Sequence, residues 1–227
     1  MSKAYTSADL ADQLDADLTW RMRELSDLKT AIARSQRNAQ LVLLRSLVTM
    51  LYAHWEGHVR FCASKYFEYI TLRKHRYDQL EKQLYINSFL SRLDAFYSRR
   101  VGIDDRCQLI SDVLDSSQRR FSRINPSLID TRSNLNSKIL KDLCKICSVD
   151  FTFFERKTTF IDTILLKRRN SIAHGEEAYI ESDEMNALVQ EGVGLMRAFK
   201  DSLQNKVYTT SYLAENLGDT ESRGHST

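Results

Sequence analysis

The sequence predicts an all-α fold, a helical bundle with additional helices inserted in its middle portion around residues 76–135. Apolar residues recur every three or four positions along most of the 227 residues, which is the spacing of amphipathic helices. One Pro and seven Gly exclude collagen-like and most turn-rich all-β designs. The length suits one large domain, which we expect over residues 1–215, with a polar, disordered tail over residues 216–227.

The N-terminal part of the chain predicts two long helices. Ser7 is a good N-cap for the first helix, whose apolar stripe spans residues 10–32. The second helix runs from Gln36 to about Arg73 and would be roughly 50 Å long. A helix of that length is expected to bend, and Gly57 is the candidate place.

The rest of the chain predicts shorter helices. A third helical segment covers residues 77–99 and a fourth, weaker one covers residues 107–121. A loop that holds the only proline follows over residues 122–136. Asn136 is expected to cap a short helix over residues 139–147.

Two further helices complete the expected fold. One covers residues 158–174 and stops at Gly175, since glycine readily takes the left-handed conformation of a C-terminal cap. The other begins after Ser182 as its N-cap and runs to about residue 207.

Composition limits the compartment and the partners. The net charge of +3 is too small to argue for or against nucleic-acid binding. The longest apolar run, around residues 47–53, is far shorter than the ~20 residues that cross a bilayer, and no leader-like pattern opens the sequence. Four Cys are too few for a disulfide scaffold. We therefore expect a cytoplasmic protein without membrane contact.

The sharpest candidate site lies at residues 168–175, Arg-Arg-Asn-Ser-Ile-Ala-His-Gly. On a helix, all the neighbours of Arg169 three and four positions away are apolar: Leu165, Leu166, Ile172 and Ala173. An unpaired buried guanidinium is costly, so this side chain either pairs with a structural carboxylate, reaches out to solvent, or faces a groove. His174 lies about 140° around an ideal helix from Arg169. The two side chains converge if the helix ends near Gly175, if the long Arg reaches round, or if a second chain supplies a matching pair.

The motif resembles the signature of a nucleotide-binding superfamily, the resemblance implies RNA cleavage without a metal, and the residue types suit that chemistry. In that reaction the 2′-OH attacks the adjacent phosphate and leaves a 2′,3′-cyclic phosphate and a 5′-OH. His174 would move the protons near neutral pH, and Arg169 would hold the growing phosphoryl charge bidentately. Asn170 would orient the His or a phosphate oxygen. Arg168 either adds phosphate affinity or is a solvated helix charge.

This motif resembles the signature of the HEPN superfamily, the higher eukaryotes and prokaryotes nucleotide-binding fold. In that signature an Arg is followed by a polar residue, and a His comes after four to six intervening positions. Four residues separate Arg169 from His174 here. Four stretches look like stand-alone prokaryotic HEPN proteins of mobile and defence loci: residues 20–25, 44–46, 52–57 and 172–176. The resemblance as a whole covers nearly all of residues 7–213. It implies a HEPN helical bundle, a homodimer and metal-independent RNA cleavage.

Other clusters have competing interpretations. His54 and His58 have the spacing of two metal ligands, but Glu56 stands at neither position that the zincin patterns require, so a structural role beside Trp55 is favoured. The resemblance gives His54 and Glu56 a supporting contact to the active cleft. Cys144 and Cys147, with no second pair, are expected to pack in the core.

Basic residues with aromatic neighbours occur in two clusters of the middle portion. Such clusters suit single-stranded RNA, although solvated helix ends are the commoner explanation. The candidate RNA-binding residues, besides Arg168, are Arg73, Lys74, Arg76, Arg119 and Arg120. No Gly-rich phosphate loop and no nucleophile elbow occurs, which argues against nucleoside-triphosphate hydrolysis and serine-hydrolase chemistry.

The sequence therefore predicts an endoribonuclease of the HEPN type, with Arg169, Asn170 and His174 as catalytic residues and with neither cofactor nor metal. The expected partners are RNA, a second copy of the chain, and an inhibitor, antitoxin or defence-system protein; the expected role is that of a toxin or anti-phage effector. A catalytically silent HEPN module that binds a protein or nucleic acid is the alternative. Toxins controlled by a nucleotidyltransferase carry a Tyr two positions after the His; Glu176 stands there, and Tyr179 is the nearest Tyr, which argues against such control.

Overall fold

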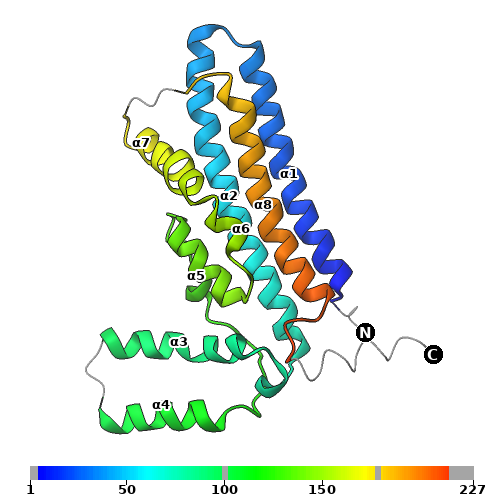
Figure 1. The fold of residues 1–227 in the computed structure, drawn as a ribbon, viewed down its shortest axis with the longest axis vertical. Coiled ribbons are helices and arrows are strands. Elements are labelled where there is room, and N and C mark those ends of the chain that lie inside the picture. Colours follow the sequence, from blue (N-terminus) through cyan, green and yellow to red (C-terminus); the bar gives the residue numbers. More distant parts are fainter. Residues whose placement is uncertain (1–4, 99–101, 177–179, 215–227) are drawn as a thin grey trace, which may run out of the picture.

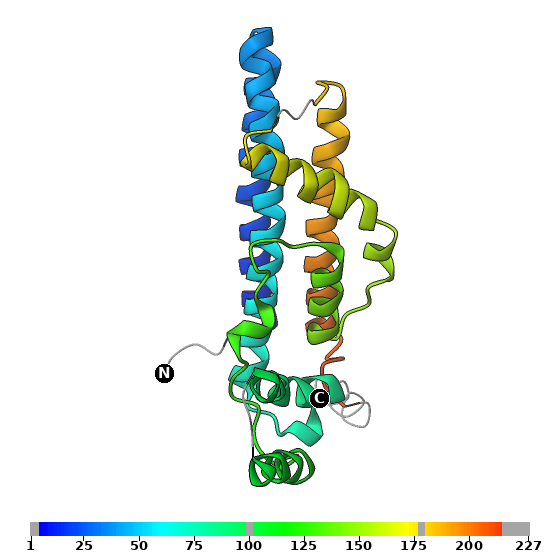
Figure 2. The same ribbon diagram turned by 90° about the vertical axis from the view of Figure 1, so that its left-hand side faces the viewer.

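The computed structural model describes residues 5–98, 102–176 and 180–214, and this part of the chain is all-α as predicted. Three long helices form the main body and lie side by side in Figures 1 and 2: α1 (Ser7–Arg34), α2 (Arg37–Arg73) and α8 (Glu184–Tyr208). The described residues contain no strand, only two isolated bridges. None of their helices combines the length and the apolar character that crossing a bilayer requires.

The two N-terminal helices have the expected extents, with corrections at two positions. Thr6, not Ser7, caps α1, because its hydroxyl accepts from the Asp9 N–H while the Asp9 carboxylate accepts from the Thr6 N–H. α2 runs without a break through Gly57, where a bend was expected. A Cβ at Gly57 would lie 3.0 Å from Nη1 of Arg21, so glycine lets the α1 arginine cross α2 closely.

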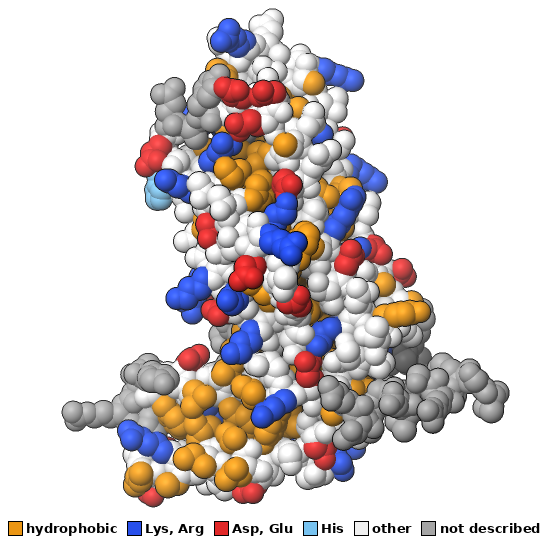
Figure 3. Space-filling model, in the orientation of Figure 1, with side chains coloured by type: hydrophobic (Ala, Val, Ile, Leu, Met, Phe, Trp, Pro, Cys, Tyr) orange, Lys and Arg blue, Asp and Glu red, His pale blue; other side chains and the backbone are white. Residues whose placement is uncertain are grey.

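The middle portion forms a hairpin that projects from the lower end of the bundle (Figures 1 and 2). It comprises η1 (Tyr77–Gln79), α3 (Lys82–Ser98), α4 (Ile103–Asp115) and η2 (Pro126–Ile129). Hydrophobic side chains gather over this hairpin in Figure 3. The predicted helix over residues 77–99 starts late because the backbone of Tyr77 and Asp78 bonds to Arg119 and Ser117 instead. The helix predicted over residues 107–121 begins earlier, at Ile103, and ends at Asp115. The predicted end of the preceding helix, residue 99, lies outside the described residues.

The remaining elements return the chain to the bundle: α5 (Ser137–Cys147), α6 (Thr152–Glu155), η3 (Phe160–Lys167) and α7 (Arg168–Ala173). Asn136 caps α5 as predicted, accepting from the Ile139 N–H at 2.8 Å. The helix expected over residues 158–174 is present, but η3 is a π-helix. Ser182 is not the cap of α8: Asp183 occupies that position without a side-chain hydrogen bond. The predicted disordered tail, residues 216–227, lies outside the described residues.

The core lies between α2 and the helices packed on it. α2 buries aromatic side chains along its length, among them Trp55, Tyr66 and Phe67. α8 approaches α2 so closely at Gly192 that a Cβ there would lie 2.7 Å from Cδ1 of Leu51. A glycine two residues on, Gly194, has no atom within 4 Å of such a Cβ.

These two glycines give a matched test of the α2–α8 contact. Gly192→Ala should lower the free energy of unfolding by about 1–3 kcal/mol because the added methyl overlaps Leu51. Gly194→Ala should raise it by about 0.5–1 kcal/mol because alanine favours the helix and meets nothing. Urea denaturation of both variants measures the difference; equal effects would contradict the close approach.

Candidate active site on helix α7

The geometry of the motif begins with the end of helix α7. The Gly175 N–H donates to the Ile172 carbonyl at 3.1 Å, and the Glu176 N–H donates to the Ser171 carbonyl at 2.9 Å. Gly175 has a φ of +79°, so this is the left-handed stop that the sequence predicted. The stop places His174 at the exposed end of the helix. The π-helix η3 leads directly into α7, and π-helical segments are frequent at functional sites.

The Arg169 side chain turns inward and is half-buried. Its guanidinium carbon lies 4.0 Å from the centre of the Tyr52 ring on α2, and its Nη2 donates to the Ser133 carbonyl at 2.9 Å. Its Nε is buried without a hydrogen-bond partner. No carboxylate among the described residues forms an ion pair with this guanidinium, so an aromatic face and a carbonyl surround its charge.

Tyr52 is the residue of this site that sequence reasoning did not single out. Burial raises the pKa of Tyr52 to about 12, and the nearby Glu56 carboxylate adds to the shift. The Tyr52 Oη and the Glu56 Oε1 are buried without a well-aligned hydrogen-bond partner. The signal in the sequence was the 52–57 stretch shared with HEPN proteins, which holds both residues. Glu56, expected to support the site, is therefore beside the ring that carries Arg169.

The other motif residues contact the loop before α5 and the start of α8. The Asn170 amide lies 3.5 Å from the Asn134 side-chain oxygen. The loop residues Arg132 and Ser133 both have positive φ angles, of 54° and 52°. Arg168 forms an ion pair with Glu184 at 2.8 Å, so its charge is already partnered.

His174 is not brought to Arg169 within one chain. Its backbone N–H donates to the Asn170 carbonyl, but no hydrogen bond or ion pair among the described residues joins its ring to the guanidinium. Neither the helix end at Gly175 nor the reach of the Arg169 side chain therefore brings the two groups together within one chain.

An apolar hollow lies beside the motif on the α2 surface. Its volume is about 640 Å³, and Val42, Met50 and Ala53 of α2 line it together with Ile172 of α7. Val42 is 64% exposed. The Arg45 guanidinium donates to the Glu176 carbonyl at 3.0 Å and ties α2 to the chain after the motif. The hollow thus joins the motif helix to an uncovered apolar strip.

His54 borders the same hollow and is held by α1. Its Nδ1 lies 3.4 Å from Nη1 of Arg21, which is always a donor, so Nδ1 is the accepting nitrogen. Its Nε2 lies 3.1 Å from the Glu24 carboxylate. Burial and the Arg21 charge lower the pKa of His54. The imidazole therefore shapes the wall of the hollow.

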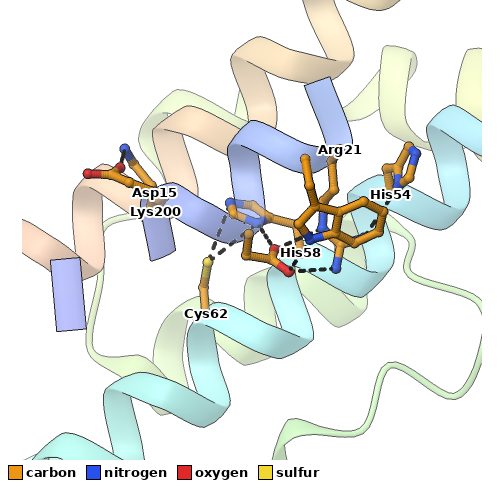
Figure 4. Close-up of polar contacts among 8 residues, drawn as sticks. Asp15, Arg21, His54, His58, Cys62 and Lys200 are labelled. Carbon is orange, nitrogen blue, oxygen red and sulfur yellow. Dashed lines mark hydrogen bonds and ion pairs between the residues drawn. The ribbon is translucent and has the colours of Figure 1, made fainter. Parts of the chain in front are cut away.

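A buried polar network joins α1 to α2 (Figure 4). The Asp17 carboxylate accepts hydrogen bonds from Nε and Nη2 of Arg21, at 2.8 and 3.0 Å, and one of its oxygens lies 2.6 Å from His58 Nδ1. Burial opposes ionisation, but the His58 and Arg21 hydrogen bonds outweigh it and lower the pKa of Asp17 to about 2. Cys62 Sγ lies 3.4 Å from His58 Nε2.

This network does not have the chemistry of a nucleophile or a metal site. Cys62 and His58 are fully buried, and burial raises the pKa of the Cys62 thiol, which keeps it protonated and inert. Among the described residues no group of three or more His, Cys, Asp and Glu side chains is arranged to hold a metal. His54 and His58 are each engaged in the α1–α2 contacts, which fits the structural interpretation. Cys144 and Cys147 are buried in the core, as predicted.

The basic clusters of the middle portion are largely tied to the protein. Arg73 stacks on the Tyr69 ring and donates to the Tyr5 carbonyl, and Arg76 pairs with Asp78. Arg120 donates to the Lys74 carbonyl. Arg119 forms no ion pair with the described residues. RNA binding by these side chains and by Lys74 stays a prediction.

Comparison with known proteins agrees with the geometry. An all-α bundle is the fold of a HEPN-type domain, a nuclease-like or RNA-related module. The profile of the RiboL-PSP-HEPN family matches residues 16–205, which is most of the chain. The chain therefore belongs to the RiboL-PSP-HEPN family. No curated protein and no solved structure matches it.

The buried network predicts a stability that depends on pH. Asp17→Asn should lower the free energy of unfolding at pH 7 by about 3 kcal/mol, because it leaves the Arg21 charge buried without its partner. Since folding lowers the Asp17 pKa from 3.8 to about 2, this carboxylate contributes fully above about pH 4 and loses its contribution as the pH falls towards 2. Denaturation at several pH values should show that the difference in free energy of unfolding between Asp17→Asn and the wild type becomes smaller in acid.

The control is Asp15→Asn, which removes an exposed carboxylate that pairs with Lys200. It should cost less than about 1 kcal/mol. If Asp17→Asn lowers the free energy of unfolding no more than Asp15→Asn does, or lowers it more in acid than at pH 7, the role given to Asp17 is contradicted.

Proposed function

We propose that this protein is a metal-independent endoribonuclease that acts as a homodimer, in the role of a toxin or defence effector. The observation that carries the proposal is the arrangement on α7. One helix of six residues holds a half-buried guanidinium and an exposed imidazole, next to an apolar hollow. Family membership supports the RNA-related part of the proposal.

The residues divide the reaction between them. A phosphate that displaces the Ser133 carbonyl from Arg169 would gain a bidentate donor whose ring contact with Tyr52 is already formed. The guanidinium then stabilises the charge that grows on the phosphoryl oxygens. His174 takes the proton of the attacking 2′-OH and a proton returns to the leaving 5′-oxygen. Asn170, at the rim of the site, orients the phosphate.

A second copy of the chain completes this site. The hollow lined by Val42, Ala53 and Ile172 is apolar, and burial of such a surface favours association. Around a two-fold axis on this surface, the two α7 helices would face each other. Arg169 of one protomer would then serve the same phosphate as His174 of its partner.

The alternative function is a catalytically silent HEPN module that binds a protein or nucleic acid. The complete motif argues for the nuclease, because a binding module needs no imidazole at an exposed helix end. Control by modification of a Tyr after the motif is disfavoured by Glu176; Tyr179 lies outside the described residues.

Cleavage of RNA in a chelator tests the nuclease. The wild-type protein should cut total RNA in EDTA and leave 2′,3′-cyclic phosphate and 5′-OH ends, which end-specific ligation detects. Arg169→Ala and His174→Ala should each reduce the rate by at least about 100-fold.

The matched control is Arg168→Ala, which removes a neighbouring arginine that is paired with Glu184. It should cleave within a few-fold of the wild type. Undiminished cleavage by both Arg169→Ala and His174→Ala, or no cleavage by the wild type, would overturn the nuclease proposal; helical circular dichroism confirms that each variant folds.

The dimer has its own test in the apolar hollow. Ala53→Glu places a charge on this exposed strip and should shift the protein to a monomer in analytical ultracentrifugation, with loss of cleavage. Leu72→Glu, an equally solvent-facing change on α2 outside the hollow, should leave the dimer intact. A dimer that survives Ala53→Glu would place the interface elsewhere.

A further inference from the structure

A cavity at the base of the α3–α4 hairpin is built from residues that the HEPN motif does not use. It lies between α3, the end of α4 and residues 116–126, and its volume is about 520 Å³, within the range of small-molecule sites. In Figure 1 the hairpin lies at the lower end of the bundle and α7 well above it, with α5 between them.

Two free cations lie at this cavity. Arg119 and Arg123 line it, and neither guanidinium forms an ion pair or hydrogen bond with a described residue. Arg92, which also lines it, is by contrast paired with Asp112 at 2.6 Å. No Asp or Glu is among the lining residues, so the cavity favours an anion. Two guanidinium groups at one cavity suit a phosphate in particular, because each can donate two parallel hydrogen bonds.

Three hydroxyls of the lining residues have no hydrogen-bond partner in the part of the chain that the structure describes. The Oγ atoms of Ser88, Ser91 and Ser116 are buried without a hydrogen bond, and Ser116 is only 3% exposed. Buried hydroxyls are normally satisfied, and three unsatisfied ones around one cavity are costly. They are donors and acceptors available to a polar ligand that enters it.

The remaining wall is aromatic. Tyr77 and Phe121 lie with ring centres 5.7 Å apart, and Phe89 lines the same cavity. Two amides line the cavity. Asn87 donates to the Ile146 carbonyl and accepts from Gln83, and the side-chain oxygen of Asn125 accepts from the Ser127 N–H. This wall therefore offers apolar and ring contacts to a planar group.

We propose that this cavity binds a nucleotide unit, with its phosphate on Arg119 and Arg123, its sugar or base edges on the three serine hydroxyls, and its base against the aromatic wall. The combination decides the ligand class, because free phosphate would leave the aromatic wall unused and a nucleoside would leave the two arginines unpaired. The nucleotide comes either free from solution or as part of an RNA strand.

Titration calorimetry with the full chain tests this site. The ligands are the four nucleoside 5′-monophosphates, inorganic phosphate, adenosine and a ten-residue oligoribonucleotide, the last on His174→Ala protein so that cleavage does not interfere. At least one nucleotide-containing ligand should bind at least about tenfold more tightly than phosphate or adenosine. Binding of monophosphates identifies a free nucleotide, and binding of the oligonucleotide alone identifies an RNA strand.

Variants tie the binding to the cavity. Arg119→Gln with Arg123→Gln should weaken binding at least about tenfold, whereas Arg60→Gln, an exposed arginine of α2 that does not line the cavity, should not change it. Ser116→Ala should weaken binding without lowering the melting temperature, because it removes an unsatisfied buried hydroxyl. Binding that is absent, equal for phosphate and nucleotide, or indifferent to the two arginines would overturn the proposal. These readouts need no cleavage, so they stand or fall apart from the nuclease.

Discussion

The burial of one broad face of α2 along most of its length is the constraint on which the rest of the structure depends. This helix carries fifteen buried residues and packs against α1, α8 and α7. Because so much of this face is enclosed, the buried imidazoles of His54 and His58 need partners inside the bundle, and Arg21 and Asp17 of α1 provide them. The part of α2 near Val42 and Ala53 is apolar and uncovered.

The same helix sets the site. Tyr52 presents its ring to Arg169, His54 forms part of the hollow, and Arg45 holds the chain after Gly175. The π-helix before α7 and the left-handed glycine after it fix where the short helix starts and stops. A guanidinium is thus kept on an aromatic face while the imidazole stays exposed at the helix end. We propose that this arrangement lets Arg169 of one protomer and His174 of its partner act on the same phosphate.

Local signals in the sequence predicted what local chemistry determines. The helical spacing, the Asn136 cap, the Gly175 stop and the apolar surroundings of Arg169 all depend on neighbours within a few residues. Contacts between segments distant in the sequence could not be predicted from these local patterns. Tyr77 leaves its expected helix because its backbone pairs with Arg119, and the partner of Arg169 proved to be a ring on α2 and a loop carbonyl. Gly57 was expected to bend α2, but its role is to admit Arg21.

The central claim is that one phosphate is served by Arg169 of one protomer and His174 of the other. Co-expression of Arg169→Ala and His174→Ala chains with different affinity tags, followed by two-step purification of the mixed dimer, tests it directly. The mixed dimer retains one intact Arg and one intact His on opposite chains, so the account predicts that it cleaves RNA although each variant alone does not. A purified mixed dimer as inactive as the two parents would contradict the shared site.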